Sequence, residues 1–109
     1  YYFAQSALQQ GHTIKTFFYG NGVEVANRLL CPAQDALNLS QLWQQLAAEY
    51  HFELAVCVAA ALRRGISDAE NSHRHHLQGD NLAQGFSLTG LGTLTELLLT
   101  SDRTLSFVG

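Results

Sequence analysis

The amino-acid sequence predicts an α/β domain in which a mostly parallel sheet is flanked by helices on both faces. Segments typical of strands alternate with segments of helical period, which is the pattern of parallel sheets with crossover helices. The length of 109 residues suits one domain, 1–109, and a hydrophobic fraction of 47% is enough for a core. The predicted strands are Thr13–Tyr19, Glu53–Val58 and Thr104–Val108, with a further candidate within Leu82–Leu88.

The N-terminal segment predicts a helix followed by a strand. Tyr1–Gln10 carries apolar residues at the spacing of one helical face, and Gly11 follows in the position of a helix-ending glycine. Thr13–Tyr19 is rich in β-branched and aromatic residues, as strands are. Because the chain opens directly on the helix, we expect the first strand of the alternating pattern to be absent from it.

The segment after the first strand predicts a turn and a short helix. Gly20–Gly22 can expose backbone amides, but it lacks the spacing of a phosphate-binding loop, so a plain turn is the better interpretation. Cys31 precedes a proline, which ends the helix because that position disfavours helical backbone. The predicted helix is Val23–Leu30, with its inward residues at Val23, Ala26, Leu29 and Leu30.

Leu39–Tyr50 is the clearest helix of the sequence. Its apolar residues recur three and four positions apart, and Asn38 or Ser40 can cap its start. Trp43 belongs to this stripe, which favours a core aromatic over an interface anchor. The stripe comprises Leu39, Leu42, Trp43, Leu46, Ala47 and Tyr50.

The stretch Glu53–Gly65 is where chemistry is most plausible. A short apolar run is followed by strong helix formers and a helix-ending glycine, so Cys57 falls where a strand ends and a helix begins. Ligands of open α/β sheets bind at that edge, and the amides of a helix start stabilise a thiolate. Arg63 and Arg64 follow and are candidates for electrostatic support. A buried structural cysteine is the alternative interpretation.

Ile66–Asn81 is polar and predicts a surface loop with room for one helical turn. It holds His73, His75 and His76, which are metal-binding side chains by type. Two of them are adjacent and no cysteine or carboxylate completes a tight ligand pattern, so solvated histidines are the better interpretation. We expect no metal and no other cofactor.

The C-terminal third predicts apolar residues between glycine turns and then a helix. Leu91 to about Thr100 has helical leucine spacing, and Thr93 and Glu96 have the spacing of a capping box. Thr104–Val108 alternates Leu105 and Phe107 inward as a final strand. The residues expected to be buried between the turns are Leu82, Phe86, Leu88 and Leu91.

Composition excludes several function classes. The net charge is −3 without a basic run, which argues against direct nucleic-acid contact. No stretch approaches the about 20 apolar residues of a membrane span. Cys31 and Cys57 follow no metal spacing and no secretion signal is visible, so free thiols in a reducing, cytoplasmic compartment are expected. One disulfide between them stays open as an alternative.

Three blocks of the sequence carry a resemblance to a known family. The first combines F-F-Y at 17–19, G-V at 22–23 and A-N at 26–27. The second is C-V-A-A-A-L-R-R-G at 57–65, and the third is N-L-A-Q-G-F-S-L-T-G-L-G at 81–92, followed by L-T-S-D-R at 99–103. Together they resemble the TusD/DsrE family of sulfur-relay proteins over nearly the whole chain.

The resemblance implies a flavodoxin-like, DsrE-like fold and a sulfurtransferase activity. The residue matching the family's cysteine is Cys57, which would accept a persulfide sulfur and relay it toward 2-thiolation of the tRNA wobble uridine. The implied partners are TusB- and TusC-like subunits of a heterohexamer, a TusA-like sulfur donor and a TusE-like acceptor. Because two proteins must reach the thiol in turn, we expect it to be exposed. The resemblance assigns no role to Cys31 or to the histidines.

Three alternatives remain beside this hypothesis. A scaffold subunit of a sulfur-relay hetero-oligomer would use the low charged fraction of 14% for extensive interfaces and would keep an inert thiol. A DsrE-type carrier would serve sulfur oxidation through the same cysteine. A nucleotide- or flavin-binding domain rests on the analogy of fold alone, without a phosphate fingerprint.

Overall fold

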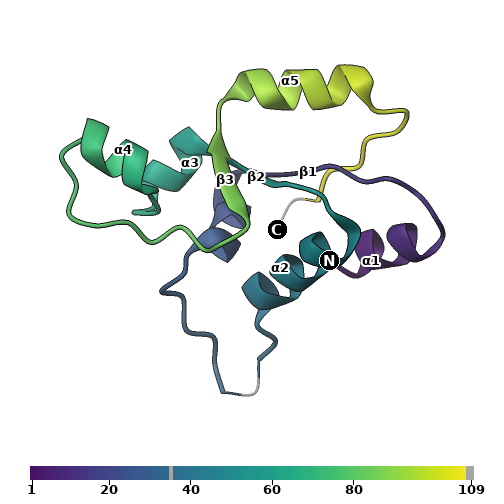
Figure 1. Ribbon diagram of the computed structural model, residues 1–109, viewed down its shortest axis with the longest axis horizontal. Coiled ribbons are helices and arrows are strands. Elements are labelled where there is room, and N and C mark those ends of the chain that lie inside the picture. Colours follow the sequence, from purple (N-terminus) through teal and green to yellow (C-terminus); the bar gives the residue numbers. More distant parts are fainter. Residues whose placement is uncertain (35, 108–109) are drawn as a thin grey trace.

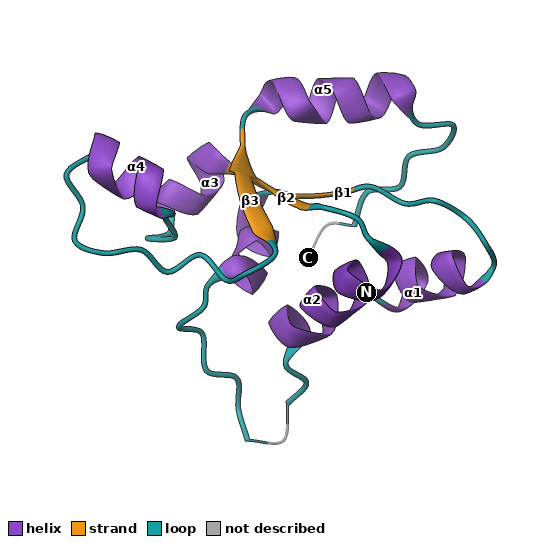
Figure 2. Ribbon diagram, in the orientation of Figure 1, coloured by secondary structure: helices purple, strands orange, loops and turns teal. Residues whose placement is uncertain are grey.

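The structure is a computed structural model that describes residues 1–34 and 36–107 of the chain. Helices and strands alternate along most of it, which confirms the predicted α/β class (Figures 1 and 2). The elements are α1 (Tyr2–Gln9), β1 (Thr16–Phe18), the 3₁₀ helix η1 (Gly20–Ala26), α2 (Leu39–Tyr50), β2 (Leu54–Cys57), α3 (Val58–Arg63), α4 (Ala69–Arg74), β3 (Phe86–Thr89) and α5 (Leu91–Thr100).

The sheet has the strand order β1-β2-β3, and both pairings are parallel. β2 is the central strand, and all four of its residues are buried. Its run of apolar residues is what a strand covered on both faces requires. The predicted strands at Thr13–Tyr19 and Glu53–Val58 are confirmed with shorter bounds. The candidate within Leu82–Leu88 forms as β3, shifted toward the C-terminus.

One face of the sheet carries the main core. Side chains alternate between faces along a strand, so Val56 and its register partner Leu88 share a face with Phe18. This face packs with Val23 of η1 and with α2, whose Trp43 ring meets the Phe18 ring edge-on at a centroid distance of 5.2 Å. The predicted core role of Trp43 is confirmed. α1 and α2 lie on this side of the sheet and α5 on the other (Figure 1).

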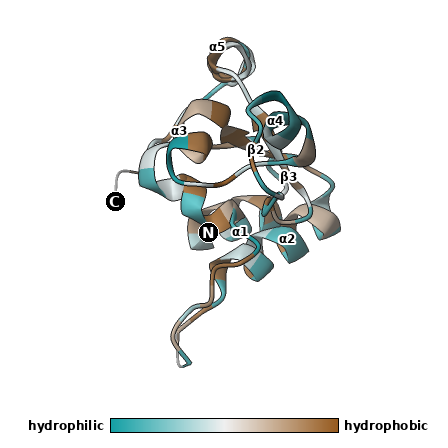
Figure 3. Ribbon diagram, turned by 90° about the vertical axis from the view of Figure 1, so that its left-hand side faces the viewer, coloured by the Kyte–Doolittle hydropathy of each residue, from teal (hydrophilic) through white to brown (hydrophobic). Residues whose placement is uncertain are grey.

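α5 stands apart from the other layer, as an end-on view shows (Figure 3). None of its residues is buried, and Leu91 and Leu99 expose 66% and 80% of their surface. A pocket of about 350 Å³ separates α5 from β1 and is partly lined by Phe17, Leu94 and Leu97. The predicted burial of Leu91 is therefore wrong, because nothing in the described chain covers this helix.

Local signals fix several helix ends as predicted. Gly11 and Gly65 follow α1 and α3 with φ of +88° and +74°, a backbone region that glycine enters without steric cost. The Asn38 side chain accepts a hydrogen bond from the Gln41 amide at 3.1 Å and caps α2. The predicted capping box at Thr93 and Glu96 is wrong. α5 already begins at Leu91 with Gly90 as its cap, so Thr93 lies inside the first turn.

The predicted final strand at Thr104–Val108 is wrong for residues 104–107, which form no strand, and Val108 lies outside the described residues. A strand needs a neighbour's backbone, but this segment contacts α1 and Tyr19, the residue after β1, through side chains. The Ser106 and Tyr19 hydroxyls lie 2.5 Å apart, and the Phe107 ring lies 5.9 Å from the Phe3 ring. Leu105 and Phe107 remain exposed at 54% and 73%, so they do not turn inward.

The predicted helix Val23–Leu30 is wrong in type and extent. Val23 and Ala26 are buried as expected, but η1 is a 3₁₀ helix that ends at Ala26, and Leu29 and Leu30 are exposed. The backbone leaves the helix because the segment at 81–83 offers other partners. The Ala83 amide donates to the Ala26 carbonyl at 2.7 Å and the Arg28 amide donates to the Asn81 carbonyl at 2.6 Å.

The segment Ile66–Asn81 forms the predicted helical turn as a short helix, but it is not a surface loop throughout. It contains α4, capped by Asp68, whose side chain accepts from the Asn71 amide at 2.8 Å. Ile66 and Ser67 are buried against the core, so only part of the segment is a surface loop. In the described part of the chain there is no helix with both the length and the apolar character that crossing a bilayer takes.

The central position of β2 makes a direct stability prediction. Leu54 is fully buried, so Leu54→Ala should lower the free energy of unfolding by about 2–5 kcal/mol, the cost of a core cavity. The matched control is Leu99→Ala, which removes the same atoms from a side chain that is 80% exposed and should change stability by under about 0.5 kcal/mol. Denaturant unfolding of the purified chain measures both. Equal losses would contradict the described core.

Candidate functional site

Cys57 is the last residue of β2 and the N-cap of α3. Its backbone is extended, with φ of −61° and ψ of 116°, and the next residue is already helical. The predicted strand-to-helix junction is therefore confirmed. The residue sits at the carboxyl end of the central parallel strand, which is the edge where open α/β sheets place their ligands. Its thiol makes no capping hydrogen bond to α3.

Burial limits access to this thiol. Cys57 exposes 9% of its surface, whereas Cys31 is exposed, and both are free cysteines. The expectation of an exposed Cys57 is therefore wrong for this chain by itself. The cause is the central place of β2, because strands flank it on both sides and α3 packs against η1 and β3 around its end.

Thr89 is the neighbour of Cys57 on β3. The two residues are register partners of parallel strands, so their side chains leave the sheet on the same face. The Thr89 hydroxyl oxygen is buried and has no hydrogen-bond partner among the described residues. Buried hydroxyls are nearly always paired, so an unpaired one beside a thiol needs an explanation. Sequence patterns did not indicate it, since only the register brings Thr89 to Cys57.

The two candidate arginines lie at the far end of α3 from Cys57. Six residues of helix span about 9 Å, and Arg63 is exposed in the last turn. The Arg64 guanidinium donates to the Asn21 side chain at 3.0 Å and to the Ala60 carbonyl at 3.0 Å. Arg64 therefore ties α3 to the start of η1, because the plain turn predicted at Gly20–Gly22 forms the first residues of this 3₁₀ helix. Any electrostatic stabilisation of the Cys57 thiolate by these two arginines therefore acts over about 9 Å.

Asn81 joins the loops beneath the site and was missed by the sequence analysis. Its amide nitrogen donates to the Gly65 carbonyl and to the Asn27 side chain, both at 3.0 Å. Its oxygen accepts from the Ser67 amide at 2.9 Å. One side chain thus fixes the ends of η1 and α3 relative to the chain that leads into β3. No local pattern signals such a role, because its partners come from two segments that are distant in sequence, at Asn27 and at 65–67.

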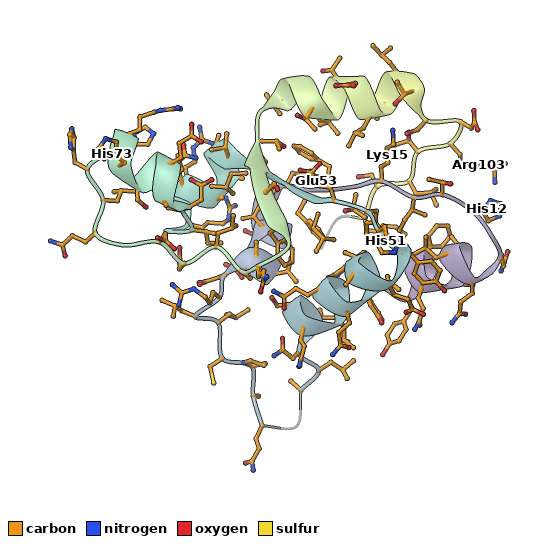
Figure 4. The ribbon with its side chains drawn as sticks, in the orientation of Figure 1. His12, Lys15, His51, Glu53, His73 and Arg103 are labelled. Carbon is orange, nitrogen blue, oxygen red and sulfur yellow. The ribbon has the colours of Figure 1, made fainter. Side chains whose placement is uncertain are left out.

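The histidines do not gather into a site. His73 belongs to α4, while His12 and His51 lie at the opposite end of the molecule (Figure 4). His73, His75 and His76 are all exposed. Within residues 1–34 and 36–107, no three histidine, cysteine or acidic side chains are grouped closely enough to hold a metal ion.

The fold and the site together define a class of protein: a small parallel α/β domain with a cysteine at the carboxyl end of its central strand. The sequence matches the family model described as the DsrE/DsrF-like family over residues 1–107. The chain belongs to the DsrE/DsrF-like family, and the predicted resemblance is confirmed.

Curated relatives narrow the comparison. The chain is 46% identical over 108 residues to a protein of Photorhabdus laumondii named sulfurtransferase TusD. The aligned region covers 98% of the chain and 82% of the relative. A Vibrio parahaemolyticus protein named sulfurtransferase TusD homolog is 47% identical, and a Yersinia pestis protein named sulfurtransferase TusD is 50% identical, with the same coverage.

The two thiols should differ in reactivity. Cys31 is exposed and should be alkylated by iodoacetamide first, while Cys57 should react roughly tenfold or more slowly, because its modification waits for local opening. Peptide mass spectrometry after short exposures measures each site. In denaturant both sites should react at similar rates, which is the control for intrinsic chemistry. Equal rates in the native protein would contradict the burial of Cys57.

Proposed function

We propose that the chain is a sulfurtransferase that accepts a persulfide sulfur on Cys57 and passes it to the next carrier. The main support for this proposal is the position of the Cys57 thiol at the carboxyl end of β2. The chain is also similar over 98% of its length to proteins named sulfurtransferase TusD. The resemblance of the segment at 57–65 to the cysteine segment of the family implies Cys57 as the carrier. Cys31 is exposed in a loop outside any helix or strand and takes no part in the proposal.

The chemistry is an exchange at sulfur without net oxidation. The Cys57 thiolate attacks the outer sulfur of a donor persulfide, a new S–S bond forms on Cys57, and the old S–S bond breaks as the donor leaves as a thiolate. In the second step the acceptor thiolate attacks the outer sulfur on Cys57 and restores the Cys57 thiolate. Persulfidation is reversible in this way, so one cysteine can serve both steps.

The surroundings of Cys57 support carriage of an anionic sulfur. The first backbone N–H groups of a helix lack partners within the helix, and those of α3 begin directly after Cys57. Arg63 and Arg64 add two positive charges at longer range, and we include them as electrostatic helpers. Their effect weakens with salt, because charges about 9 Å away lie near the Debye length of physiological solution.

We further propose that the protein works in a sulfur-relay complex. The exposed apolar residues on α5 and the C-terminal segment are typical of subunit contacts, since large exposed patches mark interaction sites. The proposed assembly is a heterohexamer with TusB- and TusC-like subunits, served by a TusA-like donor and a TusE-like acceptor in the cytoplasm. The patch comprises Leu91, Leu98, Leu99, Leu105 and Phe107.

The end product we propose is the 2-thiolated wobble uridine of tRNA, without direct contact between this chain and the tRNA. A net charge of −3 and only six lysines and arginines support the indirect role. The DsrE-type alternative, a carrier for sulfur oxidation, would use the same thiol and the same exchange. The identity of the acceptor protein distinguishes these two routes.

A non-catalytic scaffold is the second candidate, and the burial of Cys57 at 9% exposure favours it. In that case the patch on α5 would hold sister subunits while the thiol remains inert. The two candidates differ in one property, namely whether Cys57 becomes loaded with sulfur.

The test is transfer of radioactive outer sulfur from a TusA-like donor persulfide. We expect label on the wild-type protein, loss of at least about tenfold of the label in Cys57→Ser, and full label in the matched control Cys31→Ser, because only the Cys57 thiolate is the nucleophile. Gel autoradiography under non-reducing conditions measures it. An unlabelled wild type would favour the scaffold, and persistent label on Cys57→Ser would exclude Cys57 as the carrier.

A further inference from the structure

The starting observation is a polar atom without a partner beside the candidate thiol. The Thr89 hydroxyl oxygen is buried and makes no hydrogen bond among the described residues. Burying a hydroxyl without a partner costs free energy, so such groups are rare and are often tied to function. Thr89 ends β3 as Cys57 ends β2, and the two are register partners.

The register places the Thr89 and Cys57 side chains on the same face of adjacent strands. Adjacent strands lie about 4.8 Å apart, and register partners of parallel strands project from the same face. No hydrogen bond links the Thr89 hydroxyl to the Cys57 sulfur in the structure. The Thr89 hydroxyl therefore lies one strand away from the Cys57 thiol and makes no hydrogen bond to it.

A bound sulfur atom would change this arrangement. The S–S bond of a persulfide is about 2.05 Å long, so the outer sulfur stands that far beyond the Cys57 sulfur. When ionised, this outer sulfur is a hydrogen-bond acceptor that carries negative charge, and hydrogen bonds to charged groups are the stronger ones. An O–H group on the same face of the sheet, one strand away, is a suitable donor.

We propose that Thr89 donates a hydrogen bond from its hydroxyl to the outer sulfur of a persulfide on Cys57 and so holds the cargo. This inference rests on the proposed function, since it needs Cys57 to carry sulfur. Thr89 takes no part in bond making or breaking. It donates a hydrogen bond that the loaded state can accept and the empty state leaves unmade, so it favours loading and slows loss of sulfur.

The other groups near this edge do not fill the same role. The guanidinium of Arg64 is bound to Asn21 and to the Ala60 carbonyl. The amide of Asn81 is bound to Gly65 and Asn27. Of the buried side-chain polar atoms in the described residues, the Thr89 hydroxyl alone has no partner.

Two matched variants test the proposal. Thr89→Val keeps the shape and removes the hydroxyl, whereas Thr89→Ser keeps the hydroxyl and removes a methyl group. Each is equilibrated with glutathione persulfide, together with wild type and Cys57→Ser, using the protein with any subunits that copurify with it. All of these proteins also carry Cys31→Ser, so that Cys57 is the one thiol that can be loaded. Intact-protein mass spectrometry then gives the fraction of Cys57 that carries one extra sulfur atom at several ratios of glutathione persulfide to glutathione.

We expect Thr89→Val to shift the loading equilibrium toward glutathione persulfide by about tenfold or more, the effect of losing one hydrogen bond to a charged acceptor. Thr89→Ser should stay within about twofold of wild type, because it retains the donor. A loading equilibrium of Thr89→Val equal to that of wild type would overturn the proposal. A wild type that carries no sulfur on Cys57 would overturn the proposed function and this inference together, so the two failures are distinguishable.

A stability measurement separates cargo holding from a structural role. If the hydroxyl has no partner in the empty protein, Thr89→Val should leave the melting temperature of the unloaded protein equal to or above that of wild type, since valine suits a strand and removes an unpaired group. A melting temperature clearly below that of wild type would show that the hydroxyl has a structural partner, and this would also overturn the proposal.

Discussion

Strand β2 is paired on both edges and buried along its whole length, and this constraint fixes the rest of the site. Because its neighbours run parallel to it, their carboxyl ends meet at one edge of the sheet. Cys57 must lie there, and Thr89 must lie beside it. Hydrogen bonds from the Asn81 side chain link the ends of η1 and α3 to the segment that precedes β3. The Arg64 side chain adds a further link between α3 and η1.

The same constraint that places the thiol also covers it. A central strand cannot end in open solvent when helices pack around its tip, so Cys57 keeps 9% exposure. For a sulfur carrier, burial would protect a persulfide on Cys57 from reaction with other thiols. Burial would also require each partner protein to displace the residues that cover the carboxyl edge of the sheet. The layer on the other face is the place where opening is cheapest, since α5 buries none of its residues and a pocket separates it from β1.

Local features of the fold followed from the sequence, and features that depend on distant partners did not. The run before Cys57, the glycine at 65 and the cap at Asn38 act within a few residues, so their effects were predictable. The predicted strand at Thr104–Val108 had the right alternation, but its residues 104–107 do not pair with the open edge of β1 or of β3. Leu29 and Leu30 continued a helical pattern that contacts with Asn81 and Ala83 interrupt. Of the site, the position of Cys57 was predictable, whereas Thr89 depends on strand register, which no local pattern contains.

The central claim is that a sulfur atom resides on Cys57 at the edge of the sheet. A crystal structure of the protein after treatment with a persulfide donor tests this most directly. We expect electron density for one additional sulfur bonded to Cys57, with the Thr89 hydroxyl at hydrogen-bond distance from it. Additional sulfur on Cys31 with an unmodified Cys57 would contradict it.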